Sequence, residues 1–170
     1  MHSFYQGCAD AGKEGCAFWA PTAENIRANL TRLYDTLKEE PLSARLSDGR
    51  FAIVSHDSLR LAVFASLYRP FSLFSRMAEV LADLANGNAN TLFSFAPTPS
   101  FRCGRPGEEI DAFESVEDGE MAIHCTDGDA VEGGLKEMLR HYEHLSKESE
   151  WGPYWSSLRI GCAFVCFLSR

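Results

Sequence analysis

Apolar residues recur at helical spacing in four separate segments of this chain. The first segment follows Thr22, a candidate N-cap, and ends at Pro41. Its apolar stripe consists of Ile26, Leu30, Leu33, Tyr34 and Leu37. A helix with one apolar stripe is stable when that stripe packs against another element. The pattern therefore predicts a packed, mostly helical fold.

The other three segments carry similar stripes and recognisable ends. Ser55 can cap the second helix, and the Arg69-Pro70 step should end it because proline disfavours helical geometry in the preceding residue. The third helix follows at once and ends at Asn86-Gly87, and the fourth ends before Gly152-Pro153. The stripes are Leu59, Ala62, Val63 and Leu67; Phe74, Met77, Leu81 and Leu84; and Leu135, Met138, Leu139, Tyr142 and Leu145.

Between the helices the sequence predicts little β-structure. Residues 44–46 and 50–54 flank the turn dipeptide Asp48-Gly49 and predict a short hairpin. The apolar run Met121 to Cys125 is typical of one strand. Residues 7–15 and 96–119 are rich in glycine, proline or acidic residues and predict loops. We expect a helical region over residues 1–120 and a second region over 121–170.

The net charge of −8 would repel a nucleic-acid backbone, and the 16 basic residues form no local run. We therefore expect no nucleic-acid partner. No segment approaches the roughly 20 apolar residues that span a bilayer, so we expect no membrane span. The first residues lack a basic region followed by an apolar one, and we expect no signal peptide in the chain as given.

Six cysteines are many for 170 residues and favour an oxidising compartment. Cys8 and Cys16 are close enough in sequence for a local disulfide, although the sequence leaves the full pairing open. The spacings match no zinc ribbon or finger. Asn29-Leu30-Thr31 is an N-glycosylation sequon, so Asn29 is a candidate glycosylation site, although it falls inside an expected helix.

Strong catalytic signatures are absent from the sequence. It contains no G-x-S-x-G serine turn, H-E-x-x-H, P-loop or G-x-G-x-x-G. His141 and His144 have a spacing that suits a metal but no third ligand, and a solvated helix face is the more common reason for such a pair. His56 at a helix start and His124 in the expected strand are candidates for a catalytic base, although such a histidine is more often a surface or core residue. We expect no catalytic residue, no cofactor and no metal, and we keep Asp127 as a weak candidate for binding a cationic group of a substrate.

Four phrases of the chain, spread over residues 4–162, resemble one family. They are FYQGCADAGKEGCAFW, LYRPFSLFSRMAEVLADLANGN, AIHCTDG and WSSLRIGC, in that order. The pattern is similar to that of the secreted tripeptidyl aminopeptidase-like α/β-hydrolases, relatives of the proline iminopeptidases. The resemblance implies the helical cap of such an enzyme, with a short hairpin, over residues 1–120. Residues 121–170 would be a remnant of its main domain, with one strand of the sheet and a helix.

The resemblance also implies two disulfides, Cys8–Cys16 and Cys125–Cys162, because these four cysteines match the family and Cys103 and Cys166 do not. The implied parent is a secreted serine hydrolase that cleaves peptide substrates from the amino end, and this chain is a truncated fragment without the triad. Such a fragment should self-associate through exposed apolar surface. The alternative is a small secreted cysteine-stabilised binding protein without enzymatic activity.

Overall fold

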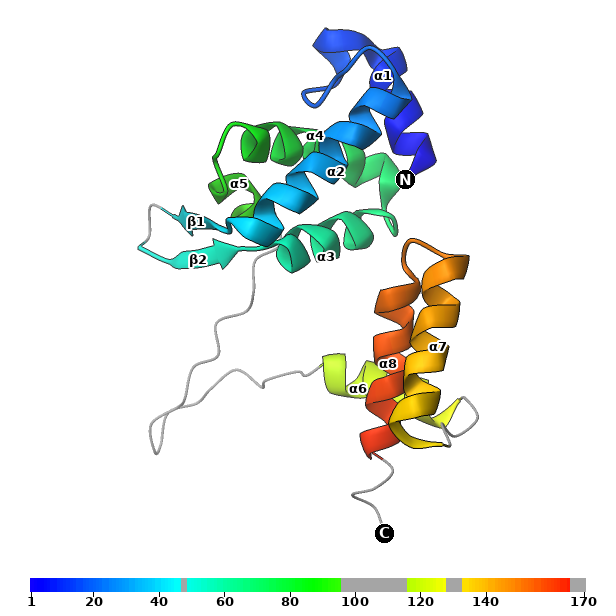
Figure 1. The fold of residues 1–170 in the computed structure, drawn as a ribbon. Coiled ribbons are helices and arrows are strands. Elements are labelled where there is room, and N and C mark those ends of the chain that lie inside the picture. Colours follow the sequence, from blue (N-terminus) through cyan, green and yellow to red (C-terminus); the bar gives the residue numbers. More distant parts are fainter. Residues whose placement is uncertain (47–48, 96–115, 128–132, 166–170) are drawn as a thin grey trace. The chain divides into compact units, whose positions relative to one another are not determined.

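The computed structural model describes residues 1–46, 49–95, 116–127 and 133–165, and these are mostly helical, as the periodicity predicts (Figure 1). Contacts divide the chain into two compact units, Met1–Phe101 and Arg102–Arg170. No helix in the described ranges is long and apolar enough to cross a membrane.

Residues 1–46 and 49–95 of the first unit form five helices and a hairpin. They are α1 (His2–Gly15), α2 (Ala23–Glu39), β1 (Leu42–Arg45), β2 (Phe51–Val54), α3 (His56–Ser66), α4 (Pro70–Ala85) and α5 (Asn90–Phe95).

The helices begin and end at the capping, proline and glycine residues that the sequence analysis identified. The Thr22 side chain accepts a hydrogen bond from the Asn25 amide at 3.2 Å and so caps α2. Pro70 stands in the first turn of α4, where its missing N–H costs nothing. Beyond α4, Gly87 has a φ of 80° and reverses the chain before α5.

The core of the first unit lies between α2, α3 and α4, whose apolar stripes face one another. Its largest fully buried apolar side chains are Ile26, Leu30, Leu37, Leu59, Val63, Met77, Val80 and Leu81. Burying a side chain of this kind contributes about 1.5–3 kcal/mol. The three stripes read from the sequence are thus the ones that hold this unit together.

The hairpin β1–β2 is antiparallel, with Leu42 opposite Val54 and Arg45 opposite Phe51. Gly49 has a φ of 87°, as the expected Asp-Gly turn requires, while Asp48 lies outside the described residues. Ala44 and Val54 are buried, and Phe51 and Ile53 lie on the exposed face.

The predicted loop over residues 7–15 is wrong, because these residues belong to α1. The helix is interrupted at Gly12, whose φ of 71° and ψ of −178° lie outside the helical region. The sequence signal was misleading because the glycines interrupt the apolar period, although Ala9, Ala11, Lys13 and Glu14 favour a helix.

The described residues of the second unit form α6 (Val116–Thr126), α7 (Gly134–Glu148) and α8 (Gly152–Val165), and α8 packs against both α6 and α7 (Figure 1). The strand expected at Met121–Cys125 is wrong, because these residues lie in α6. A short apolar run does not distinguish a strand from a helix. A lone strand would also leave its backbone polar groups unpaired, whereas a helix pairs them internally.

The loop expected over residues 96–119 is wrong at its end, since 116–119 form the first turn of α6. The rest of that segment lies outside the described residues. Residues 154–165, an aromatic and apolar stretch of the sequence, belong to α8.

Candidate functional site

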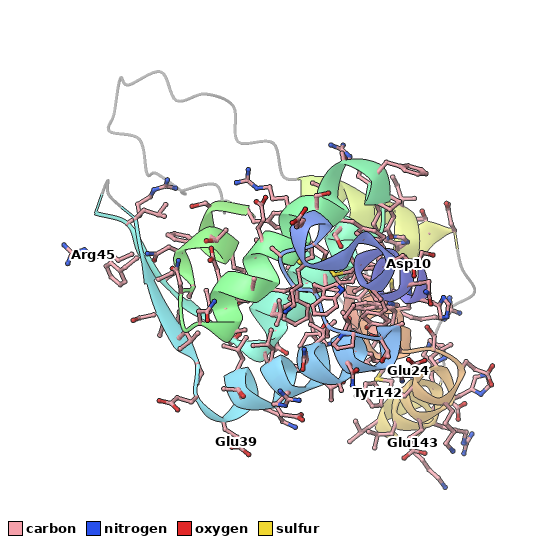
Figure 2. The ribbon with its side chains drawn as sticks, turned by 90° about the horizontal axis from the view of Figure 1, so that it is seen from above. Asp10, Glu24, Glu39, Arg45, Tyr142 and Glu143 are labelled. Carbon is pink, nitrogen blue, oxygen red and sulfur yellow. A yellow bond between two sulfur atoms is a disulfide. The ribbon has the colours of Figure 1, made fainter. Side chains whose placement is uncertain are left out.

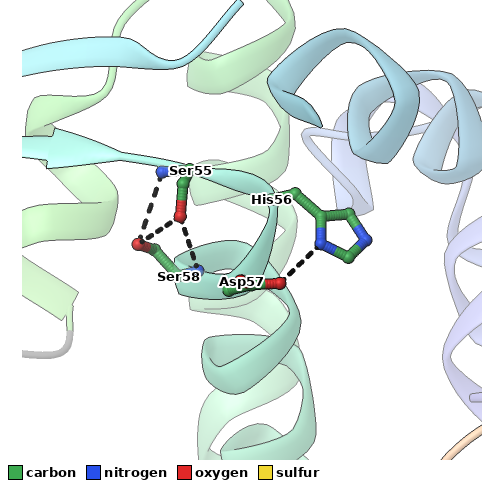
Figure 3. Close-up of polar contacts among 4 residues, drawn as sticks. All are labelled: Ser55, His56, Asp57 and Ser58. Carbon is green, nitrogen blue, oxygen red and sulfur yellow. Dashed lines mark hydrogen bonds and ion pairs between the residues drawn. The ribbon is translucent and has the colours of Figure 1, made fainter. Parts of the chain in front are cut away.

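The start of α3 gathers serine, histidine and aspartate within four residues, which makes it the first place to look for catalysis (Figure 3). Ser55 Oγ accepts a hydrogen bond from the Ser58 amide at 3.4 Å, and Ser58 Oγ accepts one from the Ser55 amide at 3.3 Å. The two hydroxyl oxygens lie 3.2 Å apart. Both serines therefore serve as a reciprocal cap of the helix.

His56 does not contact either serine. Its Nδ1 lies 2.7 Å from Asp57 Oδ1, and its ring points away from the hydroxyls in Figure 3 and packs edge-on against Tyr34. The Asp57 side chain is 93% exposed. Because a serine nucleophile needs a base within hydrogen-bond reach, this cluster is a helix cap beside a surface hydrogen bond between His56 and Asp57.

Of the other four histidines, His2 is the first residue of α1, and the remaining three lie in the second unit. His124 is on α6, with its ring 6.5 Å from that of Trp155. His144 is exposed on α7, whereas His141 Nε2 is buried without a hydrogen-bond partner. Among the residues that the structure describes, no three metal-ligating side chains come together.

The two remaining candidates from the sequence are Asp127 and Asn29, and neither belongs to a cluster of metal-ligating side chains in the part of the chain that the structure describes. Asp127 directly follows α6, where its amide donates to the Ile123 carbonyl at 3.0 Å and its side chain is exposed. Residues 128–132 lie outside the described ranges. Asn29, the glycosylation candidate, is half-buried within α2.

Each unit contains one disulfide among its described residues, and the two bonds join the same pairs of cysteines that the family resemblance implied. Cys8 and Cys16 have Cα atoms 5.2 Å apart and close α1 across the break at Gly12. Cys125 and Cys162, with Cα atoms 5.1 Å apart, join the end of α6 to α8. Cys103 and Cys166 lie outside the described residues.

A hollow of about 190 Å³ opens beside the Cys8–Cys16 disulfide, between α1 and α4. No charged side chain lines it. Its walls are Ser3, Phe4, Gly7, Cys8, Ala11, Gly15, Cys16, Phe74, Ser75 and Ala78. Sequence reasoning missed this hollow: Gly7 and Ala11 share one side of α1, and Gly15 joins them only because the chain breaks at Gly12.

The residues that the structure describes include a set of large apolar side chains with much of their surface exposed. On the first unit Phe71 is fully exposed, and Phe51, Ile53, Leu61 and Tyr68 are each more than half exposed. On the second unit the exposed apolar residues are Ile123, Leu135, Leu139, Tyr142 and Trp155. Large apolar side chains that come together in a contiguous exposed patch mark interaction surfaces on soluble proteins.

Comparison with known proteins adds no assignment: no family model, no curated protein and no solved structure matches the chain significantly. The described side chains form no catalytic constellation, and the chemistry they offer is apolar contact. The exposed apolar surfaces, rather than a cluster of polar groups, are therefore the candidate functional sites.

Proposed function

We propose that this chain is the helical cap, with an adjoining part of the main domain, of a serine α/β-hydrolase of the tripeptidyl aminopeptidase type. In this role it covers and selects a peptide substrate and supplies no member of the catalytic triad. The observation that carries the proposal is the exposure of large apolar side chains on both units.

In the proposed cap, these side chains would contact a second surface. Phe51 and Ile53 share one face of β2, and Leu61, Ala65 and Tyr68 are exposed at successive turns along α3 and its end. Covering such surface stabilises an assembly by about 25 cal/mol per Å² of apolar area. A hydrolase sheet with its apolar face turned outward would be a suitable partner.

The role of Ser55 is compatible with a cap that supplies no catalytic residue. Ser55 has the local company expected of a nucleophile but is engaged in capping α3. In the proposed parent, histidine activates a serine and an aspartate orients the histidine, and those groups come from other residues. The two disulfides are compatible with an oxidising, extracellular setting.

Complementation tests the proposal. The purified chain is mixed with the catalytic domain of a tripeptidyl aminopeptidase from which the cap has been deleted, and hydrolysis of a tripeptide p-nitroanilide is followed. We expect no turnover by the chain alone, and binding with altered peptide selectivity in the mixture. Phe71→Glu should weaken the complex, because it places a charge on the fully exposed ring position.

Thr36→Glu, which adds the same charge on the exposed side of α2, is the control and should leave the complex intact. Ser55→Ala should lower stability by about 1 kcal/mol through loss of the cap and change no activity. Turnover by the chain alone that disappears in Ser55→Ala would overturn the proposal. Failure of the mixture to associate would overturn it as well, in favour of the cysteine-stabilised binding protein.

A further inference from the structure

The apolar residues of α7 occupy more of its circumference than its contact with α8 covers. Met138 is buried and Leu145 partly buried, on the side where α7 packs against α8. Leu135, Leu139 and Tyr142 follow one another at four and three residues along the neighbouring side and are 73%, 53% and 43% exposed. We call these three residues the α7 stripe.

The edge of the α7 stripe carries a pair of opposite charges. Lys136 and Glu143 stand seven residues, or two helical turns, apart on that edge, and both are exposed. Tyr142 and Glu143 project from the α7 ribbon in Figure 2. Neither Lys136 nor Glu143 has an ion-pair partner within the described residues.

The other charged groups of α7 are placed further round the helix. Arg140 forms an ion pair with Glu137 one turn before it. By helical spacing, His144, Lys147 and Glu148 lie beyond the edge that Lys136 and Glu143 occupy. Lys136 and Glu143 are therefore the two charges that a helix seated on the α7 stripe would meet first.

We propose that the α7 stripe is a homodimer interface, in which the α7 helices of two copies pack antiparallel about a two-fold axis near Leu139. A two-fold interface must be complementary to itself. In this arrangement Lys136 of each copy faces Glu143 of the other, so the edge charges attract twice, as flanking charges do in antiparallel helix pairs.

The size of the stripe sets the strength of the dimer. The 15 residues of α7 extend about 22 Å, and one pair of such helices buries less than the roughly 1,200 Å² of a standard stable interface. The dimer should therefore be weak and concentration-dependent. It does not rest on the proposed function, because it is measured on the chain alone, without a hydrolase partner.

Sedimentation velocity over a range of protein concentrations tests the interface. Leu139→Glu should raise the dimer Kd by more than about tenfold, as expected for a charge placed at an interface centre. Leu61→Glu, an equally exposed leucine on α3, is the matched control and should leave the Kd unchanged. Far-UV circular dichroism checks that both variants are folded. The reverse result, with Leu61→Glu dissociating the dimer and Leu139→Glu not, would overturn the proposal.

A charge exchange gives the sharper test because it does not touch the apolar contact. Lys136→Glu alone and Glu143→Lys alone each place like charges opposite one another across the two-fold axis and should weaken self-association. Mixed together, the two variants should form a heterodimer as tight as the unaltered protein, with an advantage that falls as salt rises. A mixture that associates no better than either variant alone would show that the helices do not pair in this way.

Discussion

At the scale of single residues, Gly12 decides whether the first disulfide can form. In an uninterrupted helix, residues eight apart are separated by about 12 Å along the axis, yet the Cα atoms of Cys8 and Cys16 are 5.2 Å apart. The break at Gly12 turns the chain back to close this distance, in a backbone conformation essentially restricted to glycine.

Replacing Gly12 by alanine should therefore lower the free energy of unfolding by about 1–3 kcal/mol. No atom lies within 4 Å of the added Cβ, so the cost is that of the backbone alone. Gly7→Ala is the matched control. It also has open space, but a helical conformation, and should stabilise the protein by up to about 1 kcal/mol. Urea unfolding of the two variants would contradict this account if Gly12→Ala were no less stable than Gly7→Ala.

Residues with one dominant local preference could be predicted from the sequence, and Gly12 could not. Thr22 and Ser55 cap their helices as expected, because serine and threonine are strongly preferred at the position just before a helix. Glycine, in contrast, interrupts a helix at Gly12 and is tolerated inside the same helix at Gly7. Which of these applies depends on the disulfide that the surrounding chain must close.

At the scale of elements, the disulfides differ in the length of chain that they close. Cys8–Cys16 spans 8 residues and Cys125–Cys162 spans 37. By chain entropy, the first contributes about 2.5 kcal/mol and the second about 4 kcal/mol. We expect Cys125→Ala/Cys162→Ala to lose more stability than Cys8→Ala/Cys16→Ala, as measured by denaturant unfolding.

Non-reducing peptide mapping is the accompanying control, and it should find these two links with Cys103 and Cys166 as free thiols. A link between Cys103 and Cys166, or from either to the other four cysteines, would contradict the assignment. Equal losses of stability in the two double variants would instead show that the closed loop length does not govern the effect.

Elements were predictable where an apolar stripe ran for several turns, and not where apolar residues were contiguous. The helices α2, α3, α4 and α7 follow their stripes closely. Met121 to Cys125 and the residues of α8 are apolar without a period, so the sequence could not distinguish strand from helix there. The exposure of apolar residues on α3 and α7 could not be predicted either, because a sequence shows that an apolar stripe exists and not how much of it a neighbouring element covers.

At the scale of the whole molecule, the amount of uncovered apolar surface limits stability. The three helices of the second unit bury few large side chains completely, and five of their large apolar residues are exposed. Small units of this kind usually depend on disulfides or on a partner. The net charge of −8 opposes close approach of two copies, so association has to be driven by apolar contact.

The isolated chain should therefore be marginally stable and depend on its disulfides. Several hundred Å² of uncovered apolar area, at about 25 cal/mol per Å², amounts to stabilisation comparable with the roughly 5–15 kcal/mol that holds an ordinary domain together. Thermal unfolding with and without reductant, beside light scattering, measures this dependence. We expect a lower midpoint and more scattering once the disulfides are reduced. A monomer that stays folded in reducing buffer above about 65 °C, the top of the usual mesophile range, would show a self-sufficient fold and would favour a binding protein over a hydrolase cap.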